Sequence, residues 1–88
     1  MDALIKLGAN LANARRRAGI TTQKEAGERA AVIAARRGLS VSAHPVTICR
    51  QETGKGSPTV ADLLVYAEVY GVPAASLLPE ADGQERAG

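Results

Sequence analysis

Aromatic side chains are almost missing from this sequence. Its 88 residues include no tryptophan and no phenylalanine, and Tyr66 and Tyr70 are the only aromatic residues. The apolar fraction of 45% therefore comes mainly from alanine, leucine and valine. Side chains of this size suit short helices with closely approaching backbones, and no run alternates with period two over the length of a strand. The composition predicts an all-α fold.

Cysteine and histidine occur once each, as Cys49 and His44. A single cysteine cannot form an intramolecular disulfide, and the pair provides too few ligands for a structural zinc site. The longest apolar run, residues 30–35, is far shorter than the roughly 18 residues that a membrane span requires. Met1 and Asp2 begin no basic signal segment. We therefore expect a cytoplasmic chain with no metal, no other cofactor and no membrane partner.

Residues for catalysis are also lacking. No nucleophile–base pair, metal-ligand set or phosphate-cradling loop can be assembled from this sequence. Residues 54–57 look like the end of a phosphate loop, but the first glycine of that motif and its preceding strand are absent. A chain of this length forms one small domain rather than a deep cleft. We expect neither an enzyme nor a protein with a small-molecule ligand.

Positive charge is concentrated in the first two thirds of the chain. Residues 1–58 have a formal charge of +6, and residues 59–88 have a charge of −4. A chain polarised in this way attracts a polyanion to one face and repels it from another. The alternative is that these charges only solvate helix surfaces.

Apolar spacing and capping residues predict four helices and a short final turn. Thr22 with Glu25, and Thr59 with Asp62, have the spacing of capping boxes. The third helix would start near Ser42 or His44, with Pro45 in its first turn. The expected inward-facing residues are Leu4, Leu7, Leu11, Arg15 and Ala18 in the first helix, Ala26, Gly27, Ala30, Ile33 and Ala34 in the second, Ile48 in the third, and Val60, Leu63, Leu64, Ala67 and Tyr70 in the fourth.

The end of the chain differs in composition from the rest. A turn at residues 74–78 would close the core with Leu77 and Leu78. From Pro79 the sequence is polar, acidic and flanked by glycine. We therefore expect one domain at residues 1–78 and a disordered acidic tail at residues 79–88.

The most informative segment runs from His44 to Pro58. It combines a short helix that has a polar, basic outer face with glycines that end the helix and a second capped helix that follows. This arrangement is typical of the helix that a helix-turn-helix protein presents to DNA. DNA binding is the function that the segment favours.

The order of these motifs resembles the phage lambda repressor/Cro (Xre-type) helix-turn-helix family over about residues 3 to 78. The resemblance implies a compact domain of five short helices with the third helix in the major groove. It implies a small Cro-like phage or prophage repressor that occupies operator DNA. The matching residues are Gly19-Ile20-Thr21-Thr22-Gln23, then Ile48, Arg50, Glu52, Gly54-Lys55 and Pro58, and then Leu63-Leu64, Ala67, Gly71-Val72 and Leu77-Leu78.

The resemblance also implies roles for individual residues. Arg15 and Glu52 fall where the family has an ion pair between the first and third helices. For Arg16 and Arg17 a solvated helix end is an equal alternative. The residues expected to read bases are Pro45, Val46, Thr47, Arg50 and Gln51, and those expected to contact phosphate are Gln23, Lys55, Arg16, Arg17, Arg36, Arg37 and His44.

Three departures from the family pattern affect these expectations. About ten extra residues, around 32–42, lengthen the second helix or the connection that follows it. Gln51 occupies a position where the family has a buried leucine or isoleucine. Gly27 replaces the usual alanine, which would loosen the second helix unless another backbone packs against it.

Two questions stay open at the level of sequence. The chain is either a monomer or a homodimer, formed on DNA or before it, whose contact would involve Tyr66, Val69, Val72 and Leu77. The alternative to a repressor is the antitoxin of a toxin–antitoxin pair, in which the tail after Pro79 folds onto a protein partner.

Overall fold

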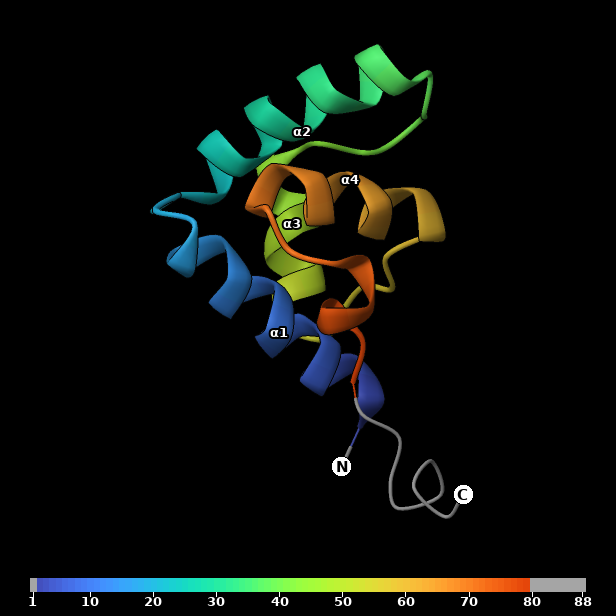
Figure 1. Cartoon of the computed structure of the whole chain (residues 1–88). Coiled ribbons are helices and arrows are strands. Elements are labelled where there is room, and N and C mark those ends of the chain that lie inside the picture. Colours follow the sequence, from blue (N-terminus) through green and yellow to red (C-terminus); the bar gives the residue numbers. More distant parts are fainter. Residues whose placement is uncertain (1, 80–88) are drawn as a thin grey trace.

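The computed structural model describes residues 2–79 and contains four α-helices and one 3-10 turn over that range. No strand occurs among these residues, which confirms the all-α prediction. The fifth helix implied by the family resemblance is only the four-residue turn η1, and the tail beyond Pro79 lies outside the described residues. In Figure 1, α2 crosses the top of the molecule and α4 passes in front of α3. The elements are α1 (Ala3–Arg17), α2 (Gln23–Arg37), α3 (Pro45–Glu52), α4 (Val60–Tyr70) and η1 (Ala74–Leu77).

Polar side chains cap the starts of α2 and α4. The Thr22 hydroxyl accepts a hydrogen bond from the backbone N–H of Glu25 at 3.1 Å. Glu25 does not complete a capping box, because its carboxylate accepts a bond from Arg29 at 2.8 Å instead. Thr59 and Asp62 do form the complete box. Each cap satisfies backbone donors that the first turn of a helix would otherwise leave unpaired.

The core lies where the four helices and η1 meet, and α2 contributes Ala26, Ala30 and Ala34 to it. The largest fully buried side chains of the core are Leu11, Ile20, Ile48, Leu77 and Val65. Because these side chains are of modest size, the helices must approach closely to exclude water. This packing is the one that the scarcity of aromatic residues predicted.

The inward face of α4 was predicted correctly for Ala67 and Tyr70 and incorrectly for Val60 and Leu64. Val60 is 74% exposed and Leu64 is 37% exposed, whereas Val65 and Tyr66 are buried. The reason lies in the first turn, where Asp62 is buried. A helix that turns Asp62 inward also turns the residues three and four positions later inward. Leu78, expected to close the core beside Leu77, is 49% exposed.

The extra residues of the sequence extend α2 to Arg37 and form the loop that leads into α3. Gly38 ends α2 in the left-handed conformation. Leu39, Val41 and Ala43 alternate along the loop and pack against the core. A Cβ atom at Gly27 would overlap the carbonyl oxygen of Ala43. The loop backbone therefore occupies the space that this glycine leaves. The sequence analysis expected another backbone to pack here if the second helix was to be stable.

Candidate nucleic-acid interface

The helix α3 is short and is held on its inner side. It packs against both α1 and α2, and its buried residues are Ile48 and Gln51. A Cβ atom at Gly8 of α1 would lie 2.5 Å from the carbonyl oxygens of Gln51 and Glu52. Glycine therefore allows α1 to lie directly against the last turn of α3.

The predicted ion pair between Arg15 and Glu52 is formed. Arg15 Nε donates to Glu52 Oε2 at 2.7 Å, and Arg15 Nη2 donates to Glu52 Oε1 at 3.0 Å. Arg15 Nη1 also donates to the carbonyl oxygen of Ile20 at 3.0 Å. The two charged side chains are 7% and 5% exposed. The hydrogen bond to Glu52 raises the pKa of Arg15 above its usual value.

Gln23 belongs to the same cluster. Its Nε2 donates to Glu52 Oε1 at 3.0 Å. The cluster joins the C-terminal part of α1, the first residue of α2 and the last residue of α3. Removal of one member of a buried pair leaves an uncompensated charge and commonly costs about 3–5 kcal/mol. We therefore interpret Gln23 as a residue that helps to position α3.

Gln51, predicted to read bases, is instead buried and 4% exposed. Its Nε2 donates to Asp62 Oδ2 at 3.1 Å, and its Oε1 accepts a bond from the hydroxyl of Tyr66. Asp62 Oδ2 also accepts a bond from the backbone N–H of Thr59 at 2.9 Å. The prediction was wrong because partners on α4 satisfy both ends of the amide, so the polar residue occupies an inward position. The position is inward, as in the family pattern.

The opposite side of α3 forms an exposed stripe, which we call the α3 stripe and define as Val46, Cys49, Arg50 and Thr53. Val46 is 60% exposed. The spacing of three and four residues places these side chains on one helix face. Cys49, to which the sequence analysis gave no role, is exposed on this face. Its spacing from Val46 and from Thr53 was the signal that could have identified it.

The two remaining residues predicted to read bases lie at the edge of this stripe. Pro45 and Thr47 are half-buried. The Thr47 hydroxyl lies 3.1 Å from the Ser42 hydroxyl in the preceding loop. Both residues belong to the first turn of α3, so they border the exposed face without being its centre.

Arg50 is joined to the loop that follows α3. Its Nη2 donates to the carbonyl oxygen of Lys55 at 3.1 Å. The backbone N–H groups of Lys55 and Gly56 in turn donate to the carbonyl oxygen of Arg50 at 2.8 and 3.1 Å. The loop is thus folded back against the end of α3, which brings the exposed Lys55 next to the α3 stripe.

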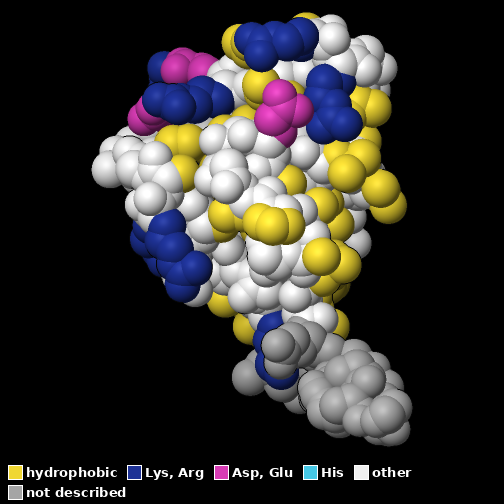
Figure 2. All heavy atoms as spheres, viewed as in Figure 1, with side chains coloured by type: hydrophobic (Ala, Val, Ile, Leu, Met, Phe, Trp, Pro, Cys, Tyr) yellow, Lys and Arg dark blue, Asp and Glu magenta, His cyan; other side chains and the backbone are white. Residues whose placement is uncertain are grey.

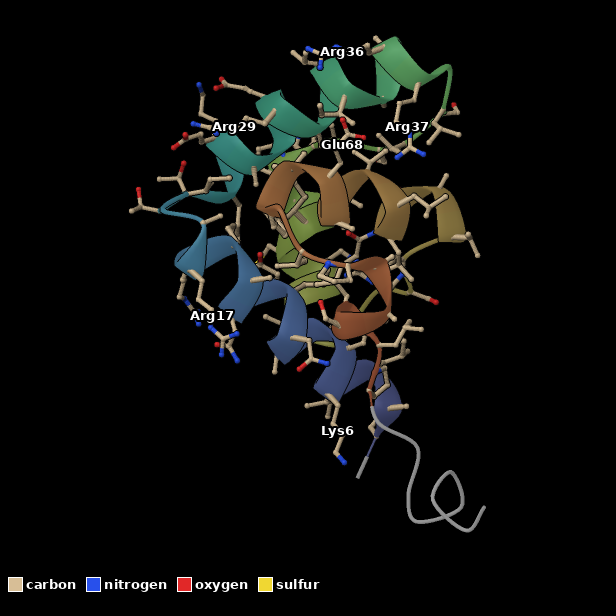
Figure 3. The ribbon with its side chains drawn as sticks, viewed as in Figure 1. Lys6, Arg17, Arg29, Arg36, Arg37 and Glu68 are labelled. Atoms are coloured by element: carbon tan, nitrogen blue, oxygen red, sulfur yellow. The ribbon has the colours of Figure 1, made fainter. Side chains whose placement is uncertain are left out.

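Other residues predicted to contact phosphate lie at helix ends. Arg16 and Arg17 are exposed at the C-terminal end of α1, and Figure 3 shows Arg17 projecting away from the fold. Arg16 Nη1 donates only to Asn13 Oδ1, at 3.4 Å. The exposed His44 caps α3, because its Nδ1 accepts a bond from the backbone N–H of Val46 at 3.1 Å. Its Nε2 has no hydrogen bond within the described part of the chain.

Arg36 and Arg37 are the last two residues of α2, and of the two only Arg37 bonds to α4 among the described residues. Arg37 Nη1 donates to Glu68 Oε1 of α4 at 3.2 Å, and Figure 3 shows the two side chains turned toward each other. α4 passes in front of α3 in Figure 1. Arg37 therefore belongs to the α2–α4 face, and Arg36 lies on the outer side of α2 in Figure 3.

The predicted dimer contact is also corrected. Tyr66 is 3% exposed and Leu77 is 1% exposed, so neither side chain can contact a second molecule. Val69 and Val72 are half-buried. Tyr66 faces inward because its hydroxyl bonds to Gln51 and its ring stacks on Tyr70, with the ring centroids 5.9 Å apart.

Residues 2–79 contain no cluster of three or more side chains suitable for a metal ion. In the same range, no helix has the length and hydropathy to cross a membrane. No protein-family model, curated protein or solved structure matches this chain.

Proposed function

We propose that this chain is a sequence-specific double-stranded DNA-binding regulator, a small Cro-like repressor of the lambda repressor type that inserts α3 into the major groove. It would act by occupying an operator and excluding polymerase, without catalysis, cofactor or small-molecule ligand. The helix-turn-helix would consist of α2 and α3, joined by a loop longer than the tight turn of the usual motif.

The observation that supports this proposal is the contrast between the two sides of α3. On the inner side, consecutive residues are fixed in opposite directions, Gln51 toward α4 and Glu52 toward α1. On the outer side, the α3 stripe is exposed and includes one arginine. A reading helix needs this combination, because bases are recognised by side chains held in a fixed orientation while the face itself stays open.

The residues of the stripe suit the major groove. The guanidinium of Arg50 can donate two hydrogen bonds to O6 and N7 of a guanine, and Val46 can pack on a thymine methyl group. Each good pairing contributes about 1–3 kcal/mol of discrimination against the wrong base. Thr47 and Pro45 would contact the groove from the edge of the stripe.

Phosphate contacts would come from Lys55 beside the stripe and from Arg16, Arg17 and His44 at helix ends. Such contacts set affinity and salt dependence but do not select a sequence. Gln23 would add a further phosphate contact through its second amide N–H, since Glu52 accepts only one. Arg37 is left out of this set because Glu68 is its partner.

Two substitutions separate base reading from backbone binding. Arg50→Ala should weaken binding to the operator by about 1 to 3 kcal/mol, relax the choice at one base pair and change binding to random DNA far less. Lys55→Ala should weaken binding to every sequence alike and lower the slope of log affinity against log salt by about 1. Fluorescence anisotropy on operator and random duplexes of equal length measures both effects.

Equal losses on operator and random DNA for Arg50→Ala would contradict its assignment as a base-reading residue. Lys24→Ala is a suitable control. Lys24 is also a lysine, its side chain is 76% exposed, and it pairs with Glu28 on α2.

A protein-interaction module of the antitoxin type is the second candidate. The observation in its favour is an apolar patch near the end of the described chain, where Val60, Leu64 and Leu78 are 74%, 37% and 49% exposed. Exposed apolar surface of this kind is common at protein contacts. Absence of any DNA preference, together with a partner whose binding is lost in Leu64→Ser, would favour this function over the first.

A further inference from the structure

The outer face of α2 and the neighbouring face of α4 enclose an open groove of about 420 Å³. Glu28, Arg29, Val32 and Ile33 line it from α2, and Glu68 and Val69 line it from α4. Its floor is apolar, and Val32 at its edge is 56% exposed. None of the DNA contacts proposed above uses this groove.

The charges around the groove are nearly balanced. Figure 2 shows positive and negative side chains close together over α2 and α4, at the top of the view, with apolar side chains between them. The positive charges come from Lys24, Arg29, Arg36 and Arg37, the last three of which are labelled in Figure 3, and the negative charges come from Glu25, Glu28 and Glu68. Glu28 already forms an exposed pair with Lys24 one turn earlier at 2.6 Å, and an exposed pair of this kind contributes little to stability, so Glu28 can turn to a partner's arginine. A nearly balanced ring around an apolar centre does not attract a polyanion. It suits a partner that has the same pattern of charge.

The order of charges along α2 makes this face complementary to itself. Glu28 lies four residues before Val32, and Arg36 lies four residues after it. In an antiparallel pair of helices related by a twofold axis at Val32, residues four positions away lie about 6 Å along the axis on either side. Glu28 of one copy then faces Arg36 of the other, and the reverse pair forms as well. A parallel pair would place like charges opposite each other.

We propose that a second copy of this chain docks on this face, with the two α2 helices antiparallel and Val32 at the centre of the contact. Ala31 and Ala35 are exposed beside Val32 and are small enough to let the two backbones approach. Arg36 has no ion-pair partner within residues 2–79, so dimer formation breaks no existing pair of this residue. This proposed contact takes the place of the dimer surface predicted from the sequence, because Tyr66 and Leu77 of that surface are buried.

The contact is small. One helix face with its groove provides less than the roughly 800 Å² per partner of a standard interface, so we expect reversible association in the micromolar range. No residue that lines the groove belongs to the α3 stripe, so the association can be measured without DNA.

Analytical ultracentrifugation over about a hundredfold range of protein concentration tests the proposal. The wild-type chain should sediment as a monomer–dimer equilibrium. Glu28→Arg and Arg36→Glu should each raise the dissociation constant about tenfold or more, because two attractive pairs become repulsive. Far-UV circular dichroism should be unchanged, since both side chains are exposed.

Charge reversal across the interface gives the sharpest outcome. An equimolar mixture of the Glu28→Arg and Arg36→Glu chains should form heterodimers, and the double variant should dimerise like the wild type. Lys6→Glu is the matched control, because Lys6 lies at the N-terminal end of α1, away from α2 in Figure 3. A wild type that stays monomeric throughout, a dimer insensitive to the single changes, or a mixture that associates no better than its components would each overturn the proposal.

Discussion

Gln51 shows how one residue can fix the rotation of a helix about its axis. A leucine at this position would fill similar space but would leave α3 free to shift slightly against α4. The amide instead has two directional partners, Asp62 Oδ2 at 3.1 Å and the hydroxyl of Tyr66. No buried side-chain polar atom among the described residues lacks a partner. The orientation of the α3 stripe therefore depends on a polar network and not on apolar packing alone.

Gln51→Leu should destabilise the protein although leucine is more hydrophobic. The change leaves the hydroxyl of Tyr66 buried without a partner, which costs about 1–3 kcal/mol. Adding Tyr66→Phe removes that hydroxyl, so the double variant should lose less than the sum of the two single losses. Urea unfolding of the four proteins measures this coupling. Strict additivity would show that the hydrogen bond does not contribute.

The buried tyrosines make stability depend on alkaline pH. Burial, and then the negative charge of Asp62, raises the pKa of Tyr66 well above its ordinary value of 10.0. Burial, and then the charge of Glu52, raises the pKa of Tyr70 in the same direction. The folded protein therefore keeps both protons at a pH at which the unfolded chain releases them.

The free energy of unfolding should therefore be fully retained below pH 10.0 and should fall as the pH rises above that value. Two tyrosines that ionise only in the unfolded chain give a slope of about 1.4 kcal/mol per pH unit each. Tyr66→Phe should reduce this slope by about half. Urea unfolding at several alkaline pH values measures it. A slope that is the same in the variant would mean that Tyr66 ionises in the folded protein.

For the secondary-structure elements, the residues at which each helix begins and ends could be predicted from the sequence. The residues that each helix turns toward the core could be predicted only in part. Thr22, Gly38, Thr59 and Gly71 act through local hydrogen bonds or local backbone conformation, so their effect is readable from sequence. The inward face of α4 depends on Asp62 being buried, which in turn depends on Gln51, eleven residues earlier. A pattern of apolar residues contains no information about such a polar contact.

Gly27 lies inside α2, where the loop backbone at Ala43 packs against it. Alanine is favoured over glycine in a helix by about 1 kcal/mol. Gly27→Ala should nevertheless destabilise the protein by about 1–3 kcal/mol, because the new methyl group would overlap the carbonyl of Ala43 and push the loop outward.

Ala31→Gly at an exposed position of the same helix is the control for the propensity term. It should cost about 1 kcal/mol. Thermal or urea unfolding gives both values. If Gly27→Ala stabilises the protein by the amount that Ala31→Gly costs, the loop does not pack on α2 as described.

At the scale of the whole molecule, two different surfaces emerge. The α3 stripe is a reading face with one arginine and with Lys55 beside it, and the α2–α4 groove is an apolar surface ringed by nearly balanced charge. The sequence located the first, because helix ends, spacing and family resemblance all converge on residues 44–58. It could not separate the two, because the charge count assigns Arg36 and Arg37 to the basic part of the chain whichever way they point. Only the contact of Arg37 with Glu68 assigns that arginine to a different face.

The ion pair between Arg15 and Glu52 links two helices and helps to set the orientation of α3 in the molecule. It was expected at the level of residues, it joins α1 to α3, and with Gln23 it fixes the side of the molecule from which α3 projects. The neighbouring bond from Gln51 to Asp62 fixes the other side. The proposed function requires this rigidity, because a loosely held helix would bind phosphate without distinguishing bases.

The most direct measurement compares binding of the wild-type chain to its own upstream region with binding to a random duplex of equal length, at two salt concentrations. The account predicts binding to the upstream region about a thousandfold or more tighter than to random DNA, with the random duplex bound weakly and lost as salt rises. Equal affinity for both duplexes, or no binding even at low salt, would contradict it.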